Sequence, residues 1–294
     1  MFPLEVLKSE DHMMTYAHKI GYLGSCLSSI PIATLVDNYG FEECFRVHHN
    51  RSDAFRKYYC ERSSRMLSRD WLDNFLVPND DENIARDAEE YLDNQMLPHI
   101  GFGATLKGMR GKGETLFDIL RNSVLDVILL DNFMDIAAKL MVKKSDAEFG
   151  GSPLFLNPHF YSNHDEIISA FEFTEYLTPH ESASNWKVIY HWFRRLQPKA
   201  KIIFICFPYA TSRDTMERFN RARDFYIEFE KIMRDEDLDI IPPLDVEEEF
   251  TNGPGDWYHV KPSLYQALAG YIFLRVVAKF PKMGSAYVLE TVGA

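Results

Sequence analysis

The sequence predicts an α/β fold in which a parallel β-sheet carries helices on both of its faces. Short apolar runs of strand length alternate with longer stretches of helical pattern along the 294 residues. Strands that are separated by helices are typical of a parallel sheet. The sequence shows no repeat, low-complexity tract or linker. We therefore expect a single domain over residues 1–294, which is long enough to bury a sizeable core.

The first strand and helix are predicted near the amino end. Residues 20–23 are mostly apolar and are typical of a strand, and residues 30–39 have the pattern of a helix. Pro31 is expected in the first turn of this helix, where its missing N–H costs little. Gly40 is expected to end the helix, because glycine readily adopts the left-handed backbone found there.

The remaining elements follow the same alternation, with two long stretches between them. Further strands are predicted at 44–48, 124–130, 201–207 and 239–241, and further helices at 214–234 and 262–280. The stretches at about 63–122 and 141–182 exceed ordinary connections. The second is rich in Pro, His, Phe and Asn, and we interpret it as a lid or substrate-binding elaboration, or as a structural insertion.

Composition and charge exclude several classes of function. The formal net charge of −12 disfavours nucleic acid or an anionic membrane as the main partner, since both require a basic surface. Charges within residues 1–14 interrupt what a signal peptide would need, and no segment approaches the length of a membrane span. The four cysteines have no CxxC spacing, so we expect a reduced, cytoplasmic protein. No oligomeric state is predicted.

The most informative short motif is Gly24-Ser25-Cys26, at the junction of the first strand and its helix. Glycine permits a tight turn, and the amino end of a helix offers free N–H groups and a positive partial charge. A thiol placed there is driven toward the reactive thiolate. Most free cysteines are inert core residues, so the motif alone does not establish catalysis.

A base and an orienting carboxylate for this thiol lie near the other end of the chain. Asp256 and His259 are three residues apart, just before the helix predicted from residue 262. A thiol nucleophile usually needs a histidine, which a carboxylate orients. Asn132 follows the third strand, where its amide is placed either to stabilise an oxyanion or to cap the strand end. The backbone N–H of Cys26 is a second candidate oxyanion donor.

These motifs resemble the SGNH (GDSL-type) hydrolase superfamily. Gly24-Ser25-Cys26 stands where that family has Gly-Asp-Ser, Asn132 where it has its oxyanion Asn, and Asp256 and His259 match its DxxH motif. No glycine follows the second strand, where the family has an oxyanion Gly. The resemblance implies a flavodoxin-like α/β/α sandwich and acyl-ester chemistry. The GSC-like turn is similar to that of bacterial polysaccharide-biosynthesis proteins, including a capsule acetyltransferase family thought to use coenzyme A.

The loop after the second strand supplies the remaining candidates. Asn50 or Ser52, or else Arg51, is expected to replace the missing glycine as an oxyanion donor. We expect His49, Arg51 and Ser25 to contact the substrate, with a surface or ion-pair role as the alternative for Arg51. His48 and His49 are a poor metal pair, because neighbouring strand residues point to opposite faces. We predict no metal and no tightly bound cofactor.

The sequence therefore predicts an acyl-transfer enzyme with a thioester on Cys26, activated by His259 and Asp256. Thioesters favour transfer over hydrolysis more than oxygen esters do, which indicates an O-acyltransferase acting on a glycan or a small metabolite. Acyl-coenzyme A is the candidate co-substrate. The alternatives are an esterase or thioesterase with the same site, and a non-catalytic ligand-binding protein on the same fold.

Overall fold

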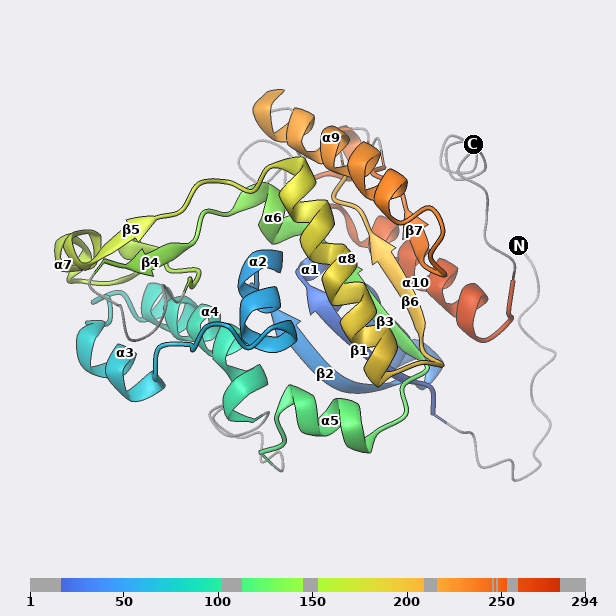
Figure 1. The fold of residues 1–294 in the computed structure, drawn as a ribbon, viewed down its shortest axis with the longest axis horizontal. Helices are drawn as coiled ribbons and strands as arrows, with labels where there is room; N and C mark the ends of the chain where they lie inside the picture. The colour runs from blue at the N-terminus through green and yellow to red at the C-terminus, as the bar shows by residue number, and fades with distance from the viewer. Residues whose placement is uncertain are drawn as a thin grey trace.

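The architecture is a three-layer α/β/α sandwich. A computed structural model describes residues 17–101, 113–144, 153–208, 216–244, 246, 248–252 and 259–280. The central sheet has five parallel strands in the order β2-β1-β3-β6-β7 (Figure 1). Their bounds are β1 (Lys19–Gly24), β2 (Glu42–His48), β3 (Val127–Asp131), β6 (Lys201–Ile205) and β7 (Asp239–Ile241). Counted among themselves, these strands have the order 2-1-3-4-5, which confirms the predicted flavodoxin-like fold.

The central strand β3 shows why the sheet is parallel. All five of its residues are buried, and four of them are apolar, as expected for a strand covered by helices on both faces. The strand begins later than predicted, because Val124 is 65% exposed. Asp126 also lies before the strand, where its Oδ2 accepts the backbone N–H of Lys19 at 2.8 Å. The apolar run thus predicted that a strand is present but not its first residue, because the exposed Val124 lies outside it.

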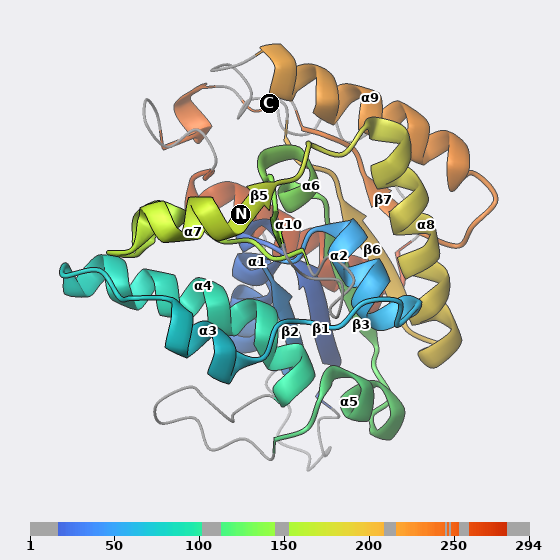
Figure 2. The same ribbon diagram turned by 60° about the vertical axis from the view of Figure 1, so that its left-hand side comes forward.

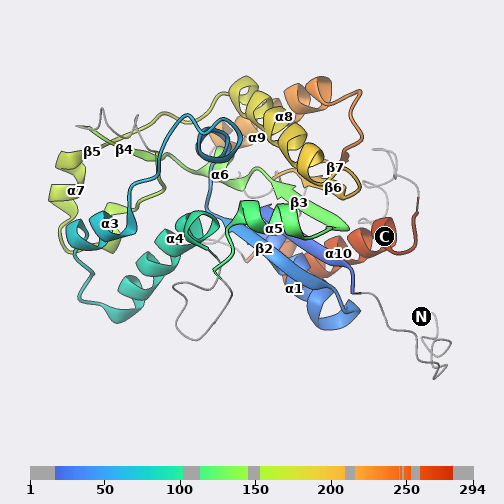
Figure 3. The ribbon, with the colours of Figure 1, turned by 60° about the horizontal axis from the view of Figure 1, so that its bottom comes forward.

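Helices cover both faces of the sheet. Figure 3 shows α1 (Cys26–Tyr39) and α10 (Pro262–Val276) on one face, and α8 (Pro179–Leu196) and α9 (Met216–Ile232) on the other. Phe204 of β6 packs its ring 5.0 Å from that of Trp186 on α8 and 4.4 Å from that of Phe229 on α9. Aromatic side chains thus fill the space between the sheet and these two helices.

The first helix confirms one prediction and corrects another. Gly40 ends α1 with a φ of 69°, the left-handed conformation predicted for it. The helix begins at Cys26, four residues before the predicted start, so Pro31 lies in its second turn and not in its first. Ser25 caps the helix through its side chain, which provides the earlier start.

Shorter elements complete the description. They are α2 (Ser52–Phe55), η1 (Arg56–Cys60), α5 (Leu116–Asn122), α6 (Phe133–Ala137) and η4 (Glu248–Phe250). Within the described ranges, no helix combines the length and apolar character needed to cross a membrane.

The two long stretches predicted from the sequence pack together beside the sheet. The first contributes α3 (Arg69–Phe75) and α4 (Glu82–Ile100). The second contributes β4 (Met141–Lys143), η2 (Pro158–Phe160), α7 (His164–Ala170) and β5 (Phe171–Phe173). Figures 1 and 2 show these elements side by side at one end of the molecule. We call them the insertion lobe.

The insertion lobe has an apolar core of its own, built from both stretches. Leu72 and Leu92 of the first belong to the same buried cluster as Leu154 and Phe171 of the second. The backbone N–H of Ser162 also donates to the carbonyl oxygen of Val77 at 2.9 Å. The lobe is therefore one packed unit and not two independent loops.

Candidate active site

The register of the sheet brings three candidate segments to one edge. Gly24 lies opposite His48, and Leu23 lies opposite Leu130, so β1, β2 and β3 end together. The segments that follow these strands carry Cys26, His49 and Asn132. Ligand sites of open parallel sheets lie at this carboxyl edge. The structure therefore places these three residues in one region, as the sequence predicted for strand ends.

Cys26 is the first residue of α1, at the sharp turn that leaves β1. A Cβ atom on Gly24 would lie 2.1 Å from Oδ2 of Asp131, so only glycine fits there. The side chain of Ser25 accepts the N–H of Leu27 at 3.2 Å. It also donates to Oδ1 of Asp131 at 3.0 Å, and Ser25 is buried. These internal bonds argue against the predicted substrate contact of Ser25, while Cys26 stays partly exposed.

Asp131, the last residue of β3, holds this turn in place. Its carboxylate accepts the backbone N–H of Ser25 at 2.8 Å and the hydroxyl of Ser28 at 2.6 Å. It also accepts the backbone N–H of Phe133 at 3.1 Å. Burial raises the pKa of Asp131, and the four hydrogen bonds that it accepts oppose this rise. The carboxylate fixes the position of Cys26 without contacting it, a role that the sequence analysis missed.

We expect Asp131→Asn to destabilise the protein. The amide nitrogen of asparagine would face either the N–H of Ser25 or that of Phe133, leaving that buried donor unpaired at a cost of about 1–3 kcal/mol. Urea denaturation measures the free energy of unfolding, with the exposed residue Asp87 as the matched control in Asp87→Asn. Equal stability of the two variants would contradict a structural role for Asp131.

Asn132 is buried and has one polar atom without a partner. Its Oδ1 accepts the backbone N–H of Phe207 at 2.8 Å. Because that N–H can only donate, the bond fixes which end of the amide is oxygen. The Nδ2 group has no hydrogen-bond partner in the described part of the chain. A preorganised, unpaired N–H at the strand edge is what an oxyanion donor requires.

The loop after β2 has fewer free hydrogen-bond donors than predicted. Ser52 donates its N–H to Oδ1 of Asp135 at 2.8 Å and its hydroxyl to Oδ2 at 2.6 Å. Both donors are therefore occupied, which argues against Ser52 in an oxyanion hole. The amide of Asn50 donates to the carbonyl oxygen of His48 at 3.1 Å, so its side chain is also engaged.

Arg51 forms an ion pair, the second of the roles expected for it, and is buried and not on the surface. Its Nε and Nη2 atoms contact the two carboxylate oxygens of Asp53 at 2.8 and 2.9 Å. Its Nη1 donates to the carbonyl oxygens of Ala138 and Glu175 at 3.2 and 3.0 Å. The side chain is 2% exposed, so it joins distant segments and is not placed to contact a substrate.

His49 adopts the backbone conformation that glycine favours. Its φ is 57°, in the left-handed region. Its ring lies 4.1 Å from the ring of His48 and 4.1 Å from that of Tyr91 on α4. Burial, together with His48, holds the pKa of His49 well below its usual range, so the ring is neutral. In the described residues, no three His, Cys, Asp or Glu side chains are arranged to hold a metal.

Acidification is expected to weaken the fold through His48. Burial, with a smaller contribution from Arg46, lowers the pKa of His48 from 6.5 to about 4. Between these values the unfolded chain binds more protons, so the free energy of unfolding falls as the pH drops from about 6.5 to about 4. The variant His48→Gln should show a shallower pH dependence in urea denaturation across this window.

The exposed residue His164 provides the control for this measurement. His164→Gln should keep the pH dependence of the wild-type protein. An unchanged slope in His48→Gln would show that His48 gains its proton as easily in the folded state as in the unfolded state.

His259 lies three residues before α10, and its predicted partner cannot be placed. Asp256 falls outside the described residues. The carbonyl oxygen of His259 accepts the N–H of Asn252 at 3.2 Å, and Val260 forms a β-bridge with Thr251. These bonds hold His259 at the start of α10, which packs against α1, the helix that begins at Cys26. The assignment of the base and its orienting carboxylate therefore stays a prediction.

Tyr91 is a site residue that the sequence analysis missed. Burial raises the pKa of Tyr91, and Cys26 is close enough to contribute to that rise. Its ring also lies 5.6 Å from that of Phe155. Tyr91 of the first stretch and Phe155 of the second thus both lie against the ring of His49. The lid or substrate-binding interpretation of residues 141–182 stays a prediction.

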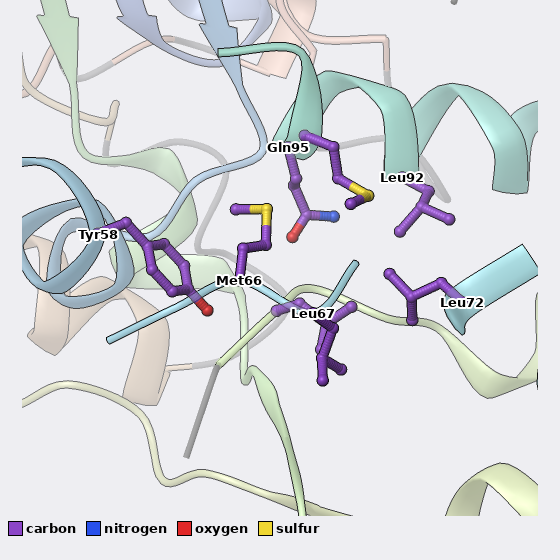
Figure 4. Close-up of a pocket in the computed structure, with 8 residues that line it drawn as sticks. Tyr58, Met66, Leu67, Leu72, Leu92 and Gln95 are labelled. Atoms are coloured by element: carbon purple, nitrogen blue, oxygen red, sulfur yellow. The ribbon is translucent and has the colours of Figure 1, made fainter. Parts of the chain in front are cut away.

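A small apolar cavity lies inside the insertion lobe. It measures about 10 Å³, comparable to a single water molecule, and leucine and methionine side chains form most of its wall. Figure 4 shows Tyr58 and Gln95 as the polar side chains among them. The hydroxyl of Tyr58 donates to the carbonyl oxygen of Pro153 at 2.7 Å, and the amide of Gln95 is paired with Phe155. The cavity is too small to hold an acyl chain.

Comparisons with known proteins give remote similarities of fold. No protein-family profile and no curated protein sequence matches the chain. An acetyl xylan esterase, Est2A, from Butyrivibrio proteoclasticus is similar with a TM-score of 0.43 and 10% identity, over 92% of this chain and 66% of its own. A family two carbohydrate esterase from Clostridium thermocellum gives 0.40 and 10%, over 89% and 64%.

A third solved structure is similar over nearly its whole length. A carbohydrate esterase of family 3 from Talaromyces cellulolyticus gives a TM-score of 0.38 and 11% identity, over 89% of this chain and 97% of its own. This chain spans just under two thirds of the length of the first two structures. At these TM-scores and identities, the similarities carry no information about the reaction.

Proposed function

We propose that the protein is an acyl-transfer enzyme that forms an acyl thioester on Cys26. The Nδ2 group of Asn132, which has no hydrogen-bond partner among the described residues, carries the proposal, because it lies at the strand edge where Cys26 starts α1. Within the described residues, the backbone N–H of Cys26 also has no acceptor. Two free N–H donors beside a thiol are the parts that acyl chemistry needs.

The first half-reaction acylates Cys26. His259, oriented by Asp256, takes the thiol proton, and the sulfur attacks the carbonyl carbon of the acyl donor. The N–H groups of Asn132 and Cys26 stabilise the resulting oxyanion. Collapse of the intermediate breaks the bond to the leaving alcohol or thiol, which takes the proton from His259. The product is a thioester on Cys26.

The second half-reaction returns the free enzyme. A hydroxyl of the acceptor gives its proton to His259 and attacks the thioester carbonyl. The same N–H groups stabilise the second oxyanion, and the thiolate leaves and regains its proton from His259. We propose acyl-coenzyme A as the donor and a glycan or small metabolite as the acceptor. With water in place of the acceptor, the same site is an esterase or thioesterase.

Intact-protein mass spectrometry with acetyl-coenzyme A tests this proposal. The expected result is a mass increase of one acetyl group, mapped to Cys26 by peptide sequencing and lost again when an acceptor alcohol is added. If the adduct is lost at the same rate with and without the acceptor, water takes the acyl group, and the protein is an esterase. Absence of an adduct with acetyl-coenzyme A and with activated acetyl esters would overturn the covalent mechanism in favour of ligand binding alone.

A further inference from the structure

A second pocket lies away from the candidate active site, where α4 and α5 approach η1 and α8. Its volume is about 300 Å³, within the range of small-molecule sites. Five rings line it, together with the side chain of Arg62: Tyr58, Tyr59, His99, Phe117 and Trp192. We call it the α4–α5 pocket. The ring of His99 lies nearly parallel to that of Tyr59, with their centroids 4.4 Å apart.

Two arginines meet on Phe117, a ring that lines this pocket. The guanidinium carbons of Arg62 and Arg121 lie 4.9 and 4.4 Å from the ring centroid of Phe117. Both arginines are exposed, and neither forms an ion pair with any residue that the structure describes. The carboxyl of Asp118, one turn before Arg121 on α5, has a lowered pKa, chiefly through hydrogen bonds from Thr115 and to a smaller extent through Arg121. Two guanidinium groups on one ring, with one carboxylate nearby, make a local positive site in a chain of net charge −12.

Two buried polar atoms in the pocket wall also lack partners. They are Oη of Tyr59 and Nε2 of His99, which form no hydrogen bond within the described residues. Buried groups without partners are uncommon, and a missing ligand is one cause. Burial lowers the pKa of His99 to about 4, so this imidazole is neutral near pH 7. Arg62 itself has a φ of 54°. Strained backbone conformations of this kind are common at functional sites.

We propose that the α4–α5 pocket binds an anion that carries a flat aromatic ring. The ring enters between the aromatic side chains, and the anionic group, a phosphate or carboxylate, is held by Arg62 and Arg121 at the rim. Because His99 is neutral, it adds no charge to the pocket, and the two arginines alone attract the anionic group. Inorganic phosphate alone lacks the ring, and a neutral ring alone lacks the charge, so each half of the ligand binds more weakly than the whole.

The α4–α5 pocket is separate from the nucleophile. Tyr91, which approaches Cys26, and His99 lie eight residues apart on α4, a distance of about 12 Å along the helix axis. α5 leads into the amino end of β3, whereas Cys26 lies at the carboxyl edge of the sheet. Binding at the pocket therefore does not require the proposed acyl chemistry, and Cys26→Ala should leave it unchanged.

Isothermal titration calorimetry with phenyl phosphate and AMP tests the proposal, with phenol and inorganic phosphate as the two half-ligands. At least one ring-bearing phosphate should bind, more tightly than either half-ligand, and salt should weaken its binding. The double variant Arg62→Gln, Arg121→Gln should lower its affinity about tenfold. Arg223→Gln, an exposed arginine on α9, is the matched control and should bind as wild type does.

A second variant addresses the buried polar atoms. Tyr59→Phe removes a hydroxyl that has no hydrogen-bond partner within the described residues, so the melting temperature should not fall. The affinity for the ring-bearing phosphate should fall severalfold, because the ligand loses a hydrogen-bonding partner. The proposal is overturned if neither ring-bearing phosphate binds more tightly than inorganic phosphate, or if the arginine double variant binds as Arg223→Gln does.

Discussion

Replacing Cys26 by alanine is expected to abolish the acyl adduct and to lower turnover of any acyl donor about 10⁴- to 10⁶-fold. The thiol is the only part of the proposed site that forms a covalent bond, so its removal eliminates both half-reactions. The side chain is partly exposed and forms no hydrogen bond within the described residues, so the melting temperature should stay close to that of the wild type. Steady-state rates and intact mass measure the two effects.

Cys44 provides the matched control, because it is another free, partly exposed thiol. Cys44→Ala should keep both the adduct and the rate. Cys26→Ser then separates transfer from hydrolysis: a serine ester that releases its acyl group to water, without transfer, assigns the esterase. Wild-type turnover in Cys26→Ala would refute Cys26 as the nucleophile.

Replacing Asn132 by alanine is expected to lower the rate of acylation about 10²- to 10³-fold. The loss arises because the oxyanion has one donor fewer, and it should appear in kcat more than in KM. Alanine also leaves the N–H of Phe207 without its acceptor, which destabilises the protein by about 1–3 kcal/mol. Asn132→Asp keeps an oxygen for that N–H while removing the donor, so it separates the catalytic effect from the structural one.

Asn185 is the control for these variants, because it is another buried asparagine whose amide makes hydrogen bonds. Asn185→Ala should lose stability and keep its acylation rate when assayed well below its melting temperature. Rapid-mixing measurements of the acyl adduct give the acylation step directly. If Asn132→Asp is acylated as fast as the wild type, the assignment of Asn132 to the oxyanion hole is wrong.

The centre of the sheet could be predicted from the sequence because its inner strands are buried on both faces. Residues 202–207 are apolar throughout, and a parallel strand covered by helices needs that pattern. The three-residue strands β4 and β5 carry no such signal, because they form only by pairing with each other. The first and last residues of the helices and strands were harder to predict, because they depend on contacts such as the side-chain cap of Ser25 at the start of α1.

The candidate site could be predicted only in part. Cys26 and Asn132 follow strands, and the parallel register alone brings strand ends together. The role of Ser52 depended on Asp135, whose carboxylate takes both of its donors across 83 residues of sequence. Tyr91 packs against His49 only because α4 of the insertion lobe lies against β2, and no local motif encodes that contact. A left-handed histidine such as His49 likewise has no signature in a single sequence.

The insertion lobe makes two distant stretches of the gene depend on each other. The N–H of Val77 donates to Oδ1 of Asn163 at 3.0 Å, and the hydroxyl of Ser162 donates to the carbonyl oxygen of Pro78 at 2.8 Å. Deleting either stretch alone would expose the apolar side chains of the other to water. It would also leave the partners of these two hydrogen bonds unpaired. A shortened descendant of this protein, natural or engineered, would therefore have to lose both stretches together, and with them Tyr91, whose ring packs against His49 at the carboxyl edge of the sheet.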